Sequence, residues 1–111
     1  MEVDWHPDAK SEFSALPPIE RRAMNTAIEK LQLLGDQLAS PHSSSVRGAG
    51  VTLRELRPRA GRSPFRAFYR RIGNRIVIGS VGPEAMSNWR GFDRAVGAAV
   101  DRLGEIEVKE L

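Results

Sequence analysis

The sequence lacks several residue types and patterns on which common functions depend. It contains no cysteine, which excludes disulfides, thiolate metal sites and a cysteine nucleophile. Its two histidines, His6 and His42, lie far apart without the spacing of metal ligands, so we expect no metal and no other cofactor. No apolar run reaches about 18 residues, and residues 1–4 lack the basic and apolar regions of a signal peptide. These absences predict a cytoplasmic protein with no membrane partner.

The 111 residues, of which 41% are hydrophobic, can form one modest core, so we expect a single domain covering residues 1–111. Between Arg47 and Arg75 lie nine arginines and one acid, Glu55, which gives this stretch a charge of +8. Because the whole chain carries only +3, the remainder carries −5. Arginine binds phosphate with a planar fork and stacks on bases, so this polarity predicts one basic face for a polyanion. A GC-rich genome would also raise the arginine content.

Hydrophobic periodicity predicts a short strand and two helices in the first third of the chain. Residues 1–6 alternate between polar and apolar side chains, as in a strand. Pro7 suits a first helical turn, and apolar residues follow at helical spacing over residues 7–16. A pair of prolines ends that helix and starts a second, whose apolar stripe runs to Leu34 before Gly35. We expect the two helices to form a hairpin on one side of a sheet.

The rest of the chain indicates strands followed by a last helix. Residues 40–50 have the composition of a flexible linker. Strand patterns follow at residues 51–57, 65–72 and 75–81. A Gly-Asn pair joins the last two strands as a tight hairpin turn, and the final strand is apolar on both faces, as in the middle of a sheet. Ser87 or Asn88 caps a last helix, and the acidic tail at residues 104–111 permits a small edge strand.

The predicted order of elements is β-α-α-β-β-β-α, and we assign the chain to the α+β class. An N-terminal helical hairpin and a C-terminal helix would then pack on a small, mostly antiparallel sheet. In the strand at residues 65–72, alternation places Arg66, Phe68 and Arg70 on one face and Phe65, Ala67 and Tyr69 on the other.

Two segments carry a resemblance to a known family, namely VRGAGVTLRELRPR at residues 46–59 and FRAFYRRIGNRIVIGSVG at residues 65–82. In the first, a basic-glycine turn leads into a strand of the form apolar-x-Glu-Leu-Arg. In the second, an aromatic and arginine-containing strand precedes an apolar one. With the chain length and the order of elements, these segments resemble the RelE/ParE superfamily of type II toxins, in particular its HigB-like branch. The resemblance implies a RelE-like fold and a toxin neutralised by a cognate antitoxin protein.

In these toxins the implied chemistry is cleavage of mRNA in the ribosomal A site, which makes the ribosome and mRNA implied partners. The RNA 2′-hydroxyl attacks its neighbouring phosphate, and positive side chains on the open sheet face stabilise the developing charge. Arg66 matches the strand arginine that holds the phosphate in the family, and Arg57 matches a basic residue of the preceding strand. We expect catalytic roles for Arg57, Arg66 and Glu84, and RNA-binding roles for Arg54, Arg59, Arg70 and Arg90.

The turn before the last helix departs from the family pattern. RelE-like and HigB-like enzymes usually carry basic residues there, whereas this chain has none between its last strand and Arg90. An arginine has too high a pKa to act as a general base, which leaves Glu84, Tyr69, His42 and Glu55 as candidates for proton transfer. We take Glu84 as the catalytic candidate, although a negative charge ahead of a helix N-terminus also has a structural explanation.

The sequence leaves three functions open. The leading one is a ribosome-dependent mRNA endoribonuclease that inhibits translation. The second is a ParE-like inhibitor of DNA gyrase, which needs no ribonuclease residues and is favoured by the missing basic turn. The third is a catalytically inactive RNA-binding relic, whose basic sheet face would bind RNA with a steep salt dependence.

Overall fold

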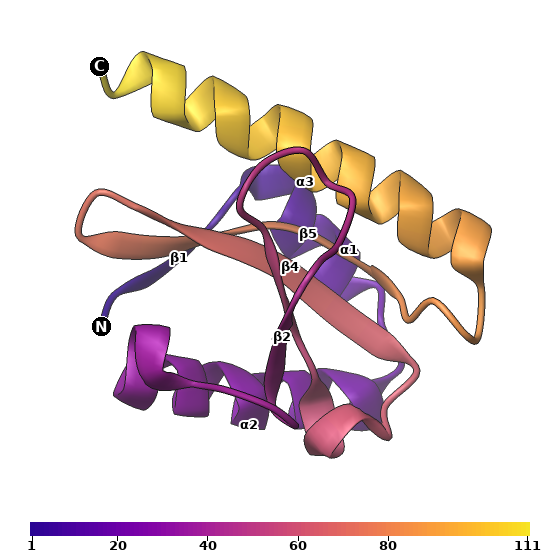
Figure 1. The fold of residues 1–111 in the computed structure, drawn as a ribbon. Coiled ribbons are helices and arrows are strands. Elements are labelled where there is room, and N and C mark those ends of the chain that lie inside the picture. The colour runs from indigo at the N-terminus through magenta and orange to yellow at the C-terminus, as the bar shows by residue number, and fades with distance from the viewer.

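The computed structural model describes all residues from 1 to 111. Its elements in chain order are β1 (Val3–Trp5), α1 (Pro7–Ser14), α2 (Pro18–Leu34), the 3₁₀ helix η1 (Gly35–Gln37), β2 (Ser43–Ser45), β3 (Arg54–Leu56), the 3₁₀ helix η2 (Pro58–Gly61), β4 (Phe65–Ile72), β5 (Arg75–Pro83) and α3 (Trp89–Lys109). The sheet runs between α2 on one side and α3 on the other, and both chain ends lie at the same end of the molecule (Figure 1). None of these helices is both long enough and apolar enough to cross a membrane.

The five strands form one sheet in the order β1-β5-β4-β3-β2. β1 pairs with β5 in parallel, and every other neighbouring pair is antiparallel, which confirms the predicted α+β class. β5 has a strand on each side, as its apolar sequence predicts. β2 was not predicted, because its three serines carry no apolar alternation and instead form backbone pairs with β3. The segment at residues 40–50 is therefore not simply a linker.

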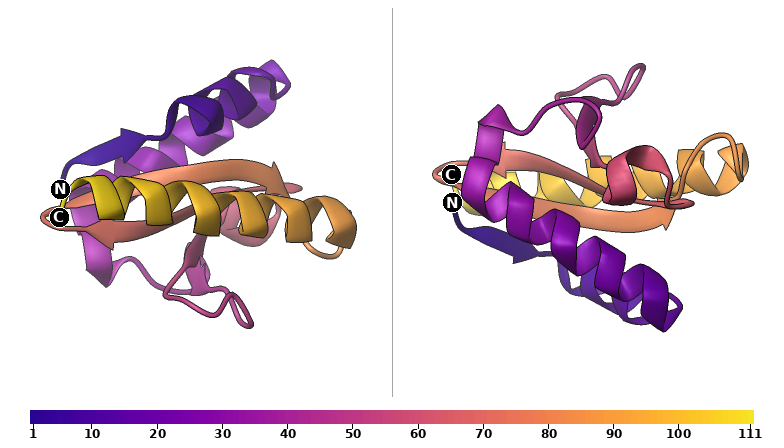
Figure 2. Two further views of the ribbon diagram at one scale, coloured as in Figure 1. Left: turned by 90° about the horizontal axis from the view of Figure 1, so that it is seen from above. Right: turned by 90° about the horizontal axis from the view of Figure 1, so that it is seen from below.

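Helices cover both faces of the sheet and create two cores (Figure 2). The helical hairpin buries one face, where Met24 and Leu31 of α2 pack with Leu56 and Ile78. The terminal helix α3 buries the other face around Phe68. Ala67 and Tyr69 belong to the first core and Phe68 to the second, so the predicted alternation of β4 is confirmed.

Two glycines of β5 allow α3 to lie close to the sheet. The β4–β5 register shifts because Phe68 pairs with Ser80 and Tyr69 with Ile78, which leaves Gly79 as an extra residue. A Cβ atom on Gly79 would lie 2.7 Å from Cγ of Leu103. A Cβ on Gly82 would lie 2.5 Å from Cβ of Ala95. Any larger residue at either position therefore collides with α3.

The terminal helix differs from the prediction in extent and in position. Asn88 caps it, as predicted, because its side-chain oxygen accepts a hydrogen bond from the Gly91 N–H at 2.9 Å. The small edge strand that the sequence permits at residues 104–111 does not form, since the helix continues to Lys109. Its apolar stripe extends through Leu103, and Glu107 in the last turns pairs with Arg70 of β4. The sheet face that carries Arg66, Phe68 and Arg70 is thus covered by a helix along most of its length.

Candidate active site

A pocket of about 350 Å³ opens where α3 leaves this face uncovered, at the start of β4. We call it the arginine pocket. Its walls come from the end of β2 and the residues after it, from β3 and the residue after it, from β4, from the turn between β5 and α3, and from the start of α3. The lining residues are Ser45, Val46, Arg47, Glu55, Arg57, Arg66, Glu84, Ala85, Met86 and Phe92. All three residues predicted to be catalytic (Arg57, Arg66 and Glu84) line this one pocket, although their roles stay predictions.

Strand register explains why these side chains meet. Glu55 of β3 lies opposite Phe68 of β4, so its side chain is on the α3 face of the sheet. Arg66 precedes Phe68 by two residues and therefore shares that face. After β5 ends, the Glu84 N–H donates to the Pro64 carbonyl at 2.8 Å, which holds the turn beside the start of β4. Residues distant in sequence thus converge on the same end of the sheet.

The Arg66 side chain is buried at the pocket, where backbone carbonyls hold its guanidinium group. Its side chain is only 3% exposed, and Nη1 donates to the carbonyls of Ser63 and Phe65 at 2.7 and 2.9 Å. Nη2 donates to the Gly61 carbonyl at 3.2 Å. Nε has no hydrogen-bond partner and lies 3.7 Å from Oε1 of Glu55. Burial lowers the pKa of Arg66, with Glu55 opposing that shift.

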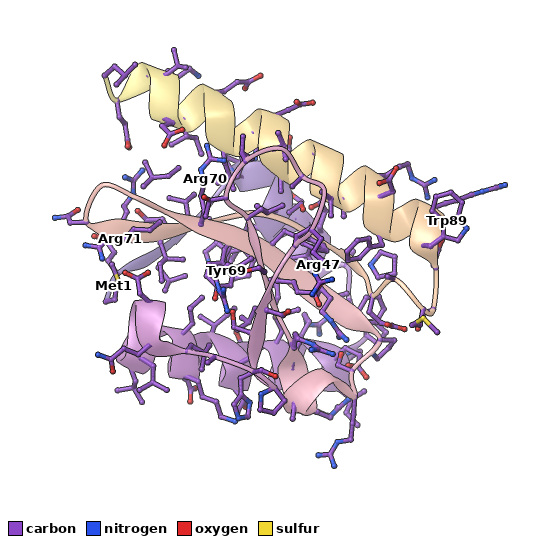
Figure 3. The ribbon with its side chains drawn as sticks, viewed as in Figure 1. Met1, Arg47, Tyr69, Arg70, Arg71 and Trp89 are labelled. Atoms are coloured by element: carbon purple, nitrogen blue, oxygen red, sulfur yellow. The ribbon has the colours of Figure 1, made fainter.

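Two other arginines at the pocket are held much less firmly. Arg57 is 30% exposed, its Nε lies 3.7 Å from Oε1 of Glu55, and its side chain makes no hydrogen bond. Arg47 is exposed and has neither an ion pair nor a hydrogen bond. Its side chain lies in front of β4 in the middle of the molecule (Figure 3). These guanidinium groups have donors free for a ligand, whereas those of Arg66 are largely satisfied within the fold.

The two carboxylates of the pocket have opposite electrostatic environments. Burial raises the pKa of Glu55, against the lowering effect of Arg66 and Arg57. The Ser87 hydroxyl donates to Glu84, as does the Met86 N–H, and these hydrogen bonds lower the pKa of Glu84. Glu55 is therefore the better proton acceptor of the two. Glu84 is also engaged in holding the turn that leads to α3.

The four residues predicted to bind RNA lie outside the pocket. Arg54 is on the opposite face of β3, where it donates to Ser43 and Ser45. Arg59 pairs with Glu20 of α2 at 3.0 Å, and Arg70 pairs with Glu107 of α3 at 2.8 Å. Arg90 is exposed at the start of α3 and lies 6.0 Å from the ring centroid of Trp89. Arg90 is thus the one of these four without an intramolecular ion pair or hydrogen bond.

The expectation of one basic face is wrong. Six of the nine arginines between positions 47 and 75 lie within 4 Å of a carboxylate, namely Arg57, Arg59, Arg66, Arg70, Arg71 and Arg75. Their acidic partners come from many parts of the chain, including β1, α2 and α3. Much of the cluster therefore joins sheet to helices, and within it Arg47 is unpaired and Arg57 is only loosely paired with Glu55.

The other predicted proton-transfer candidates also have structural surroundings. Tyr69 belongs to the hairpin core and shares a hydrogen bond with Ser43. His42 lies outside the arginine pocket and lines a separate groove beside α2. Arg47 was not among the predicted site residues, although its basic-glycine turn is part of the family resemblance. No group of three or more histidine, aspartate or glutamate side chains is arranged to hold a metal ion.

Comparisons with known proteins agree with this architecture. The family model described as "Phage derived protein Gp49-like (DUF891)" matches residues 11–80, which include every strand-borne residue of the pocket. A mutant of the E. coli toxin RelE in the free state is similar in structure, with a TM-score of 0.60 and 18% sequence identity. The match covers 86% of this chain and 94% of that chain, and at this identity it establishes a RelE-like fold.

No curated protein matches the sequence. The family match nevertheless spans more than half of the chain, and the RelE-like fold supports the same family assignment independently. Together they support a toxin of a toxin–antitoxin pair, with an antitoxin as its partner. The chain belongs to the phage-derived Gp49-like family, within the RelE superfamily.

Proposed function

We propose that this protein is a HigB-like toxin of a type II pair that cleaves mRNA on the ribosome in the cytoplasm. The observation that carries the proposal is the arginine pocket, where Arg47, Arg57 and Arg66 surround Glu55. Arg57 and Arg66 each have an Nε without a hydrogen-bond partner, and Glu55, whose pKa is raised by burial, lies between them. Such a pairing of cations and base suits attack of an RNA 2′-hydroxyl on the adjacent phosphate.

In this mechanism the phosphate binds at the mouth of the pocket. Arg57 and Arg47 donate to its non-bridging oxygens, because an arginine fork matches phosphate geometry. Arg66 remains anchored to the carbonyls behind it and adds a fixed positive charge. Fixed charges of this kind stabilise the pentacoordinate transition state without reorganisation. Arg66 thus acts mainly as a positioning residue for Glu55 and the turn at residues 61–65.

Glu55 accepts the proton of the 2′-hydroxyl. The 2′-oxygen then bonds to phosphorus, the bond to the 5′-oxygen breaks, and that oxygen takes up a proton. The products are a 2′,3′-cyclic phosphate and a 5′-hydroxyl. Glu55 suits this step better than Glu84, because a raised pKa favours proton acceptance near neutral pH. Trp89, 65% exposed, and Arg90 offer a further contact to RNA at the start of α3 (Figure 3).

Inhibition of DNA gyrase is a second candidate, favoured by one feature. The turn between β5 and α3 carries Glu84 and no basic residue, and its Met86 is 93% exposed. An exposed apolar residue beside an acid suits a protein partner better than RNA. Gyrase inhibition would use this turn and leave the arginine pocket without a role.

Controlled expression in bacteria without antitoxin separates the two functions. The wild type is compared with Arg57→Ala and with Arg94→Ala, a matched control because Arg94 is exposed on α3 and makes no ion pair or hydrogen bond. We expect growth arrest and new mRNA ends within translated codons for the wild type and for Arg94→Ala, and neither for Arg57→Ala. Arrest with intact mRNA and broken DNA would support the gyrase function instead. Unchanged toxicity of Arg57→Ala would contradict the proposed site.

A further inference from the structure

A second concave surface lies beside α2, on the side of β3 that faces the helical hairpin. We call it the α2 groove; it has a volume of about 300 Å³. Ile19, Ala23 and Leu56 contribute apolar surface to it, and Ile19 is 57% exposed. The outer side of α2 has no other element packed over it (Figure 2). This groove plays no part in the proposed cleavage mechanism.

The charges around the groove are of one sign. Arg22, Lys30, Arg57 and Arg59 line it, and no acidic residue does, although Arg59 is paired with Glu20 of α2. Arg22 and Lys30 make no ion pair or hydrogen bond, in contrast to the many arginines of this chain that pair with carboxylates. Eight residues of helix separate Arg22 from Lys30, so they lie about 12 Å apart along α2. Two unpaired cations therefore flank an apolar surface that a partner with carboxylates and apolar side chains would complement.

The apolar surface continues along α2 beyond the groove. Leu33 is 84% exposed and Leu34 is 48% exposed. Both lie three to four residues after Lys30, so they share its side of the helix. An exposed apolar stripe in line with a groove is typical of a protein-binding surface. The groove is lined by no Phe, Tyr or Trp, the aromatic side chains with the largest stacking surface, and His42 is its one ring that could stack on a base, so a protein segment fits it better than single-stranded RNA.

Arg57 lines both the α2 groove and the arginine pocket. Its guanidinium is not anchored by hydrogen bonds, and its nearest carboxylate oxygen, on Glu55, is 3.7 Å from Nε. A carboxylate entering the groove can thus compete with Glu55 for Arg57. Because Arg66 is held by three backbone hydrogen bonds, Arg57 is the pocket arginine that such a ligand can displace.

We propose that the α2 groove is the docking site of the antitoxin. The antitoxin lays a segment of acidic and apolar residues along α2, between Arg22 and Lys30, and one of its carboxylates engages Arg57. This contact withdraws Arg57 from the arginine pocket, so the toxin is inhibited without the pocket being filled. The identity of the partner rests on the proposed toxin function.

The test uses the purified chain and, as the probe, the protein encoded by its neighbouring gene. Binding is measured by calorimetry for the wild type, for Arg22→Glu/Lys30→Glu, and for a matched control, Arg94→Glu/Lys109→Glu. The control reverses one arginine and one lysine that are exposed and unpaired on α3. We expect the groove variant to bind at least about tenfold more weakly while remaining folded and toxic. The control should bind as the wild type does.

Several outcomes would overturn the proposal. It fails if the wild type does not bind the probe, or if a folded groove variant binds with unchanged affinity. It also fails if the groove variant binds normally but loses toxicity, because the groove would then carry RNA. If the double reversal does not fold, Arg22→Ala/Lys30→Ala replaces it, with a smaller loss expected. Calorimetry needs no cleavage activity, so failure of the proposed enzyme function does not obscure the result.

Arg57→Ala tests the link between the two surfaces. It should lose mRNA cleavage and also bind the probe several-fold more weakly, because Arg57 serves both sites. Unchanged affinity of Arg57→Ala would overturn the claim that the antitoxin engages this residue.

Discussion

At the scale of single residues, Arg66 and Arg57 of the arginine pocket differ in how firmly the fold holds them. The Nη atoms of Arg66 donate hydrogen bonds to three backbone carbonyls, whereas the Arg57 side chain makes no hydrogen bond. A group that binds a substrate needs free donors, and a group that positions others needs fixed ones. The same residue type therefore serves two purposes, in β4 for Arg66 and directly after β3 for Arg57. Both share Glu55, whose Oε1 lies 3.7 Å from each Nε.

The first prediction concerns stability. Arg66→Ala removes the donors of three carbonyls and leaves Glu55 with less charge compensation. We expect it to lower the free energy of unfolding by about 3–5 kcal/mol, the range for breaking a buried charged interaction. Arg57→Ala, at a half-buried and loosely paired site, should cost about 1 kcal/mol or less. Urea unfolding of the two variants checks this, and equal losses would contradict the assigned difference in anchorage.

The second prediction concerns Glu55 and pH. Burial raises its pKa above the ordinary value of 4.5, so the folded protein binds this proton more tightly than the unfolded chain does. The stability that Glu55 contributes is complete below pH 4.5 and is lost as pH rises through the raised pKa. As pH falls from 7 toward 4.5, the free energy of unfolding of the wild type should therefore increase relative to that of Glu55→Gln. If the wild type does not become more stable relative to Glu55→Gln on acidification, burial does not raise the pKa of Glu55.

At the residue scale, the three residues predicted to be catalytic, Arg57, Arg66 and Glu84, line one pocket, whereas the four predicted RNA contacts lie outside it; the roles of all seven stay predictions. Arg54 differs from Arg57 by an odd number of positions, so alternation alone assigns it to the opposite face. For Arg59 and Arg70 no local pattern suffices. Their partners, Glu20 and Glu107, are 39 and 37 residues away in sequence, and only the folded chain brings them together.

At the scale of elements, the strongly periodic segments were predicted and the weakly patterned ones were not. α1 and α2 have clear apolar stripes, β4 alternates and β5 is a continuous apolar run, and all four form near the predicted residues. β2 has only serines and depends on pairing with β3, a contact that no local pattern encodes. The tail reads as an alternating strand in isolation, but packing against the sheet continues α3 through it.

The third prediction tests the close approach of α3 to β5. Gly79→Ala adds a Cβ that would lie 2.7 Å from Leu103 and 3.1 Å from the Cα of Ala99. Since helix backbone cannot yield as a flexible side chain does, α3 must shift. We expect a loss of about 1–3 kcal/mol in the free energy of unfolding. Gly97→Ala is the matched control, because no atom lies within 4 Å of its Cβ position, and it should be neutral or stabilising. Equal effects of both substitutions would argue against the steric explanation.

At the scale of the whole molecule, helices on both faces confine the site to one end of the sheet. α3 covers the centre of the face that carries Arg66, and the arginine pocket opens only where this helix begins. Ion pairs from the same arginine-rich stretch attach α2 and α3 to the sheet. Several arginines of this stretch thus hold the helices against the sheet, and only a few others remain free to bind a ligand.

The most direct test of the proposed cleavage site is a single-turnover assay with purified protein and ribosomes programmed with a defined mRNA. We expect the wild type to cut the mRNA in the A site and to leave a 2′,3′-cyclic phosphate. Glu55→Gln and Arg57→Ala should each slow cleavage by at least about 100-fold, in line with loss of a general base or of transition-state charge stabilisation. The same rate for either folded variant as for the wild type, or no cleavage by the wild type, would contradict the proposal that the arginine pocket is the catalytic site.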